Sequence, residues 1–100
     1  MPNTNPPTSN KKEFQRKLDL AKNRMYCNYA FYFGATAENA DDLASLKDLE
    51  GCCGIKLFAG SSTGNLLVAE EDDIDKVFQN ASKVVAVHSE DEAILKVIKN

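Results

Sequence analysis

Two side chains that could do chemistry lie within or at the end of apolar runs. Lys56 lies inside Ile55-Lys56-Leu57-Phe58, and His88, the only histidine, ends the run Val84-Val85-Ala86-Val87. A lysine is almost never buried without a partner for its charge. An imidazole can bind a metal ion or transfer a proton. Both residues therefore need an explanation beyond core packing.

Lys56 has two interpretations. In the first, its strand lies at the edge of a sheet and the amine simply reaches solvent. In the second, burial favours a neutral amine, which acts as a nucleophile or reacts with carbon dioxide to give a carbamate that binds metal. In either case, strand alternation predicts that Lys56 and Phe58 face away from Ile55 and Leu57.

His88 also has two interpretations, as a structural residue with its hydrogen bonds satisfied or as a metal ligand. It is expected at the carboxyl end of a strand, followed by Ser89-Glu90-Asp91. Ligands collect at the carboxyl ends of strands in parallel sheets. One histidine cannot hold a metal alone, so further ligands must come from elsewhere.

Apolar runs typical of strands alternate along the chain with segments whose apolar residues recur at helical spacing. These strands and helices would position Lys56 and His88. Strands are predicted at 26–33, 53–58 and 83–88. Four amphipathic helices carry apolar residues at helical spacing: Phe14, Leu18, Ala21 and Met25; Ala40, Leu43 and Leu46; Ile74, Val77, Phe78 and Ala81; and Ile94, Val97 and Ile98. Their predicted starts are Asn10 with Glu13, Thr36, the acidic residues 70–73, and Ser89 with Glu92. This order predicts an α/β fold, a parallel sheet with flanking helices.

Composition excludes several classes of protein. The chain has 100 residues, 43% of them apolar, and a net charge of -3, which is typical of one folded domain without a basic surface for nucleic acid. The longest apolar run, Tyr29–Phe33, is far shorter than the roughly 20 residues of a membrane span. The first ten residues have no apolar core of a secretion signal, and the three cysteines form no paired motif. We therefore expect a cytoplasmic protein with reduced cysteines, independent of membranes.

The polar stretch Gly60–Asn65 consists of small residues that could bring backbone N–H groups together around an anion. It lacks the Gly-Lys-Ser/Thr ending of a phosphate-binding P-loop. We therefore expect a tight polar turn beside a site and no nucleotide.

Four blocks of sequence resemble the central part of dihydroorotases, which belong to the cyclic amidohydrolase superfamily. They are Met1–Thr8 (MPNTNPPT), Gly54–Phe58 (GIKLF), Gly60–Asn65 (GSSTGN) and Val87–Asp91 (VHSED). The blocks follow the family's order and approximate spacing, and the similarity extends over essentially the whole chain. The first block is the most specific, because allantoinases and hydantoinases usually depart from it after Met-Pro.

The resemblance implies a (β/α)8 TIM barrel, which takes about 250 residues. Residues 1–100 would be a single segment of it, about three βα units from the end of the second strand to the fifth helix. The family reversibly interconverts N-carbamoyl-L-aspartate and dihydroorotate in pyrimidine biosynthesis, using one or two zinc ions. By motif match, Lys56, as N6-carboxylysine, and His88 would bind metal, and Asn3 would bind the substrate carboxylate. Because some dihydroorotases replace this lysine, carboxylation of Lys56 is a hypothesis.

The resemblance also implies that other functional residues lie outside the segment. The family's His-x-His pair and substrate-binding arginine would precede Met1, and its later histidine and its acid/base aspartate would follow Asn100. We therefore expect no catalytic residue in this chain, no activity of the chain alone, and self-association through open sheet edges. Two alternatives remain: another cyclic amidohydrolase, such as an allantoinase or hydantoinase, or a small non-catalytic α/β module.

Overall fold

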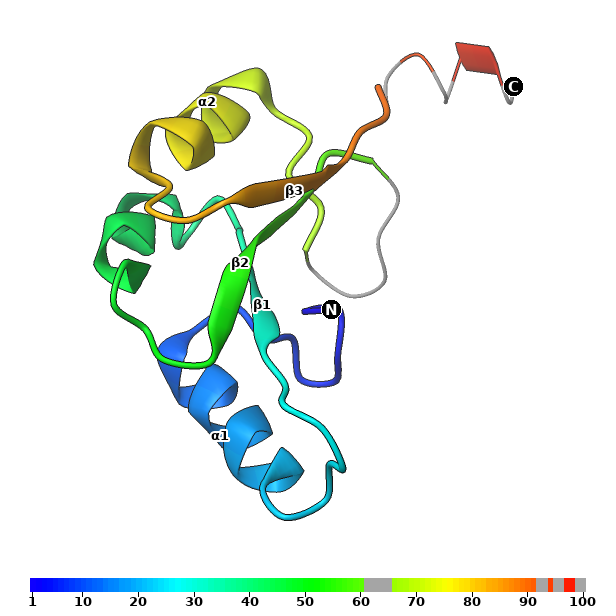
Figure 1. The fold of residues 1–100 in the computed structure, drawn as a ribbon. Coiled ribbons are helices and arrows are strands. Elements are labelled where there is room, and N and C mark those ends of the chain that lie inside the picture. The colour runs from blue at the N-terminus through cyan, green and yellow to red at the C-terminus, as the bar shows by residue number, and fades with distance from the viewer. Residues whose placement is uncertain (61–65, 92–93, 95–96, 99–100) are drawn as a thin grey trace.

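The chain folds around a three-stranded parallel sheet (Figure 1). The computed structural model describes residues 1–60, 66–91, 94 and 97–98. Their elements, in chain order, are α1 (Lys11–Ala21), β1 (Phe31–Gly34), the 3-10 helix η1 (Ala40–Leu46), β2 (Cys52–Phe58), α2 (Glu71–Asn80) and β3 (Val85–His88). The sheet order β1-β2-β3 equals the chain order, and both pairings are parallel. The prediction of an α/β fold with a parallel sheet is confirmed.

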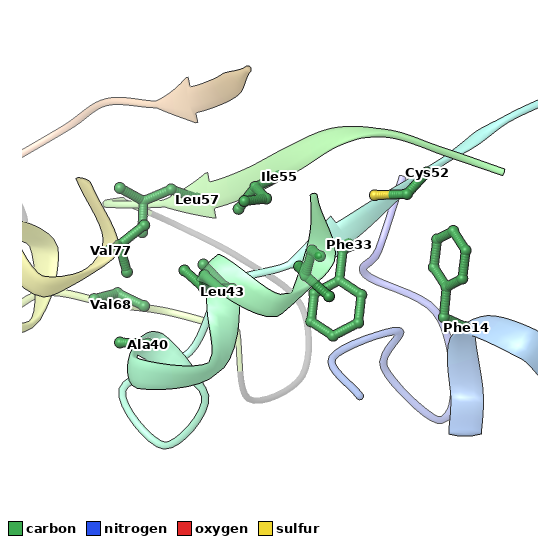
Figure 2. Close-up of a cluster of buried hydrophobic side chains, with 11 residues drawn as sticks. Phe14, Phe33, Ala40, Leu43, Cys52, Ile55, Leu57, Val68 and Val77 are labelled. Atoms are coloured by element: carbon green, nitrogen blue, oxygen red, sulfur yellow. The ribbon is translucent and has the colours of Figure 1, made fainter. Parts of the chain in front are cut away.

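The core lies on one face of the sheet, between the strands and the helices. Ile55 and Leu57 of β2 are completely buried, and Figure 2 shows them pointing toward Leu43 of η1 and Val77 of α2. Phe14 of α1 joins the same cluster. The helices therefore cover the Ile55 side of the sheet, and the N-terminal segment lies beside β1 (Figure 1).

Helix α1 begins as its sequence predicts and ends early. Asn10 Oδ1 accepts a hydrogen bond from the Glu13 N–H at 2.8 Å, which confirms Asn10 as the cap. The helix spans 11 residues, about three turns instead of four. Asn23 then adopts a left-handed φ of 65°, a conformation that stops a helix. Met25 lies beyond this stop and is exposed, so its assignment to the helical stripe was wrong.

Strand β1 is shorter than the predicted strand at 26–33. Its register with β2 begins where Phe31 faces Cys52, and Tyr26 is fully exposed. Aromatic and apolar residues favour a strand, but a strand also requires a neighbouring chain that accepts its hydrogen bonds. The preceding residues lie outside this pairing, so the predicted start was wrong.

The predicted second helix forms as a 3-10 helix. Just before this helix, the side chains of Thr36 and Asn39 each accept a hydrogen bond from the other residue's backbone. Thr36 N–H donates to Asn39 Oδ1 at 2.7 Å, and Asn39 N–H donates to Thr36 Oγ1 at 3.1 Å. The stripe Ala40, Leu43 and Leu46 is buried as predicted. Its strict spacing of three residues matches a helix with three residues per turn, in which such side chains lie directly above one another.

Helix α2 carries the predicted acidic first turn and buries Val77, but it leaves Phe78 exposed. Phe78 is therefore wrong as a core residue. Phe78 follows Val77 in α2 and points in a different direction. Together with Leu57 and Val87, it lines a groove of about 850 Å³ between α2 and β3.

After β3, Asp91 Oδ1 accepts a hydrogen bond from the Ile94 N–H at 3.1 Å, a capping contact predicted for Ser89. Ile94, Val97 and Ile98 are exposed. The predicted partner Glu92 and residues 61–65 of the Gly60–Asn65 loop lie outside the described residues. Within the described part of the chain, no helix is long and apolar enough to cross a membrane.

The three cysteines are free thiols in different surroundings, which predicts different reactivities. Cys27 and Cys53 are exposed, whereas Cys52 is buried and burial raises the pKa of its thiol. Because the thiolate is the reactive form, we expect Cys27 and Cys53 to react rapidly with iodoacetamide and Cys52 only after unfolding. Peptide mapping of the alkylated native chain measures this. Rapid native labelling of Cys52 would contradict the packing of β2 described above.

Candidate functional site

Lys56 lies in the middle strand of the sheet. Its neighbours in register are Gly34 of β1 and Ala86 of β3. The interpretation of an edge strand is therefore wrong. Neither neighbour has a side chain larger than a methyl group, and Lys56 is half-buried.

The predicted alternation along β2 is confirmed. Lys56 Nζ lies 5.3 Å from the centre of the Phe58 ring, on the face opposite the buried Ile55 and Leu57. At that distance a lysine ammonium is attracted to the face of the ring. The Phe58 ring therefore lies beside the amine of Lys56.

His88 lies on the same face as Lys56. It pairs in register with Phe58, two residues beyond Lys56, and residues two apart in a strand share a face. The imidazole and Phe58 ring centres are 6.4 Å apart. Standard strand spacings place the Cα atoms of Lys56 and His88 roughly 8 Å apart. The structure thus brings the two predicted metal ligands to one face of adjacent strands.

Asn3 is carried by a segment that lies beside β1. Pro2, the preceding residue, is buried, and its Cβ would lie 3.0 Å from a Cβ added to Gly34. The Thr8 carbonyl accepts a hydrogen bond from the Gly34 N–H at 2.8 Å, and Thr8 N–H donates to the Pro2 carbonyl at 2.9 Å. Asn3 is therefore held next to the strand residue that adjoins Lys56.

The loop that bears Asn3 is braced from within and from α1. Thr4 Oγ1 donates to the Pro6 carbonyl at 2.8 Å and lies 2.9 Å from Thr8 Oγ1. Lys17 Nζ of α1 donates to the same carbonyl at 3.1 Å. The sequence predicted this stretch only as a proline-rich loop, and the structure gives it a fixed shape.

Glu90 is the site residue that the sequence reasoning missed. His88 Nε2 and Glu90 Oε1 are 2.8 Å apart, and both side chains are half-buried. A carboxylate two residues after a histidine at a strand end was the available signal, because alternation can return both to one side. The sequence was interpreted only as a polar stretch after the strand.

These residues fit part of a metal site. Imidazole nitrogen and carboxylate oxygen are ordinary zinc ligands. His88 and Glu90 contact each other at the end of β3, and Lys56 lies on the His88 face of the adjacent strand β2. Among the residues that the structure describes, however, no three His, Cys, Asp or Glu side chains gather closely enough to hold a metal ion. The described chain thus offers ligands from two strands, which is less than a complete site.

Comparisons with known proteins point to one family of enzymes. No protein-family model matches the chain. Over 91% of its length the chain is 31% identical to a dihydroorotase from Methanosarcina mazei, 29% to one from Thermococcus kodakarensis, and 30% to one from Methanosarcina acetivorans. In each case the match covers 20% of the relative. The chain spans about a fifth of the length of these curated relatives, and across that fifth it is similar to dihydroorotases.

Proposed function

We propose that the chain is the metal-carrying segment of a dihydroorotase. In this proposal Lys56, carboxylated on Nζ, and His88 bind zinc, and Asn3 contacts the substrate. The observation that carries the proposal is that Lys56 and His88 share the sheet face opposite the helices. The similarity to three dihydroorotases supports the choice of family.

The order of the strands supports a segment of a barrel. Connections between parallel strands are right-handed in about 98% of cases, so strands that follow one another in one direction place their helices on one face. Doubly wound sheets instead reverse direction and cover both faces. Here the order is β1-β2-β3, and α1, η1 and α2 all bury side chains in one cluster. We therefore propose that the face carrying Lys56 and His88 is the inner surface of a (β/α)8 barrel.

Carboxylation would make Lys56 a better metal ligand. Its neutral amine adds to the carbon of carbon dioxide and loses a proton, so that the product is a carbamate anion with two oxygen donors. Bound zinc would polarise the amide carbonyl of dihydroorotate and activate the attacking water. The Asn3 amide would donate a hydrogen bond to a substrate carboxylate.

A chimera tests the proposal. In the Methanosarcina mazei dihydroorotase, the stretch that aligns with this chain is replaced by residues 1–100, and the zinc content and hydrolysis of dihydroorotate are measured. We expect zinc-dependent turnover of dihydroorotate. A folded, zinc-loaded chimera that hydrolyses hydantoin or allantoin instead would favour the alternative amidohydrolases. One that hydrolyses none of them would favour a non-catalytic module.

The chain alone should not turn over dihydroorotate. In the proposal the chain supplies two metal ligands, Lys56 and His88, whereas catalytic zinc usually has three protein ligands, and within the described residues no group of three His, Cys, Asp or Glu side chains could hold a metal ion. The purified 100-residue chain, with and without added zinc, is assayed beside the chimera under identical conditions. Zinc-dependent turnover by the chain alone would show that it forms a self-sufficient site, contrary to this proposal.

A further inference from the structure

We infer that Glu90 is a positioning residue for His88, whose carboxylate holds the imidazole as its Nε2–H tautomer and leaves Nδ1 as the metal-binding atom. The role toward metal rests on the proposed function. The tautomer itself is a property of the metal-free chain and can be measured separately.

The hydrogen bond between the two side chains determines where the proton is. His88 Nε2 lies 2.8 Å from Glu90 Oε1. An ionised carboxylate only accepts hydrogen bonds, and a neutral imidazole has one N–H and one lone pair. With Glu90 ionised and the imidazole neutral, the N–H is at Nε2 and the lone pair at Nδ1. An outer carboxylate that orients a histidine in this way also makes it a more basic ligand.

Among the described residues, the other contacts of His88 do not distinguish its two ring nitrogens. The His88 carbonyl accepts a hydrogen bond from the Ala59 N–H at 2.9 Å, which fixes the backbone of β3 against the end of β2. The Phe58 ring lies beside the imidazole at an interplanar angle of 33°. A ring contact restricts where the imidazole lies, but it does not choose between two nitrogens. The charged carboxylate of Glu90 does choose, because it accepts a hydrogen bond from the nitrogen that carries the proton.

Gly60 makes room for the carboxylate. A Cβ added to Gly60 would lie 2.6 Å from Glu90 Cβ and 2.8 Å from Glu90 Oε2. Any larger residue would displace Glu90 from its place beside His88. The glycine that follows β2 thus allows the loop after β3 to approach closely.

Nitrogen NMR of the single histidine tests the tautomer. The chain is labelled with [15N]histidine, and long-range 1H–15N correlations are recorded above about pH 8, where an ordinary imidazole is neutral. All histidine signals come from His88, because it is the only histidine. We expect the Nε2–H form in the wild type and a larger share of Nδ1–H in Glu90→Gln, whose amide can donate to Nε2.

The NMR experiment also includes a control variant and a variant that lacks the carboxylate of Glu90. Glu71→Gln changes an exposed carboxylate of α2 in the same way and should leave the tautomer unchanged. Glu90→Ala removes the acceptor altogether and should weaken the preference for Nε2–H. Amide dispersion in the same spectra verifies the fold of each variant. An equal tautomer ratio in folded wild type, Glu90→Gln and Glu90→Ala would overturn the inference.

Addition of zinc chloride distinguishes this inference from the proposed function. We expect the Nδ1 signal to shift while Nε2 keeps its proton, and Glu90→Ala to weaken zinc binding at His88 by about 10- to 100-fold. A shift at Nε2 in its place would overturn the positioning role. If the tautomer depends on Glu90 but zinc shifts neither nitrogen, positioning is supported and the proposed metal role of His88 in this chain is contradicted.

Discussion

In the active chimera, Lys56→Ala should reduce the turnover of dihydroorotate by at least about 100-fold, beyond the range typical of groups that only support a ligand. Lys56 is the only lysine on β2, and its amine lies on the face shared with His88. Removing it would delete one of the two metal ligands of the proposed site, and its register neighbours Gly34 and Ala86 carry no group that could replace it. The measurements are kcat for dihydroorotate and zinc per protein.

The matched control is Lys76→Ala, which removes an exposed lysine from α2. It should leave both turnover and zinc content unchanged. A Lys56→Ala chimera that retained full turnover and its zinc would show that Lys56 is not a metal ligand. Intact-mass measurement before substitution adds a second readout, since carboxylation adds the mass of one carbon dioxide molecule. An uncarboxylated Lys56 in a chimera with its full zinc content would reject carboxylation, but it would not contradict the fold.

The face on which Lys56 lies could be predicted from the sequence, but its place in the sheet could not. Alternation is a local property of one strand and correctly placed Lys56 opposite Ile55 and Leu57. Strand order depends on contacts between distant parts of the chain. The middle position of β2 requires both β1 and β3 as neighbours, which is why an edge strand was the simpler interpretation of a lysine in an apolar run.

The same division between local and distant contacts explains the other differences. Asn10 caps α1 as predicted, because capping depends on neighbours a few residues away. The predicted acidic residues 70–73 lie at the start of α2, where they face the positive end of the helix dipole. The start of β1 depends on the pairing of Phe31 with the distant Cys52. Phe78 is exposed because it lines the groove next to β3. Glu90 was missed because its significance depends on the rotamer that brings it to His88.

A comparison of adjacent residues in β2 should give the largest difference in stability. We expect Leu57→Ala to lower the free energy of unfolding by about 2–5 kcal/mol, the usual cost of truncating a buried leucine. Leu57 is completely buried among Ile55, Val68 and Val77. A typical domain has only about 5–15 kcal/mol in total, so this one substitution would remove a large fraction of the stability.

Lys56→Ala, in contrast, should change the free energy of unfolding by less than about 1 kcal/mol. The contact it loses between Nζ and the Phe58 ring is worth about 0.5–1 kcal/mol where the ammonium is not fully desolvated, and Lys56 is only half-buried. Urea unfolding of the two variants and the wild type, followed by far-UV circular dichroism, measures both changes. If Lys56→Ala cost as much as Leu57→Ala, the lysine would be a packed core residue, contrary to its proposed role as a metal ligand. A small cost at Lys56 together with lost turnover in the chimera would instead separate its chemical role from folding.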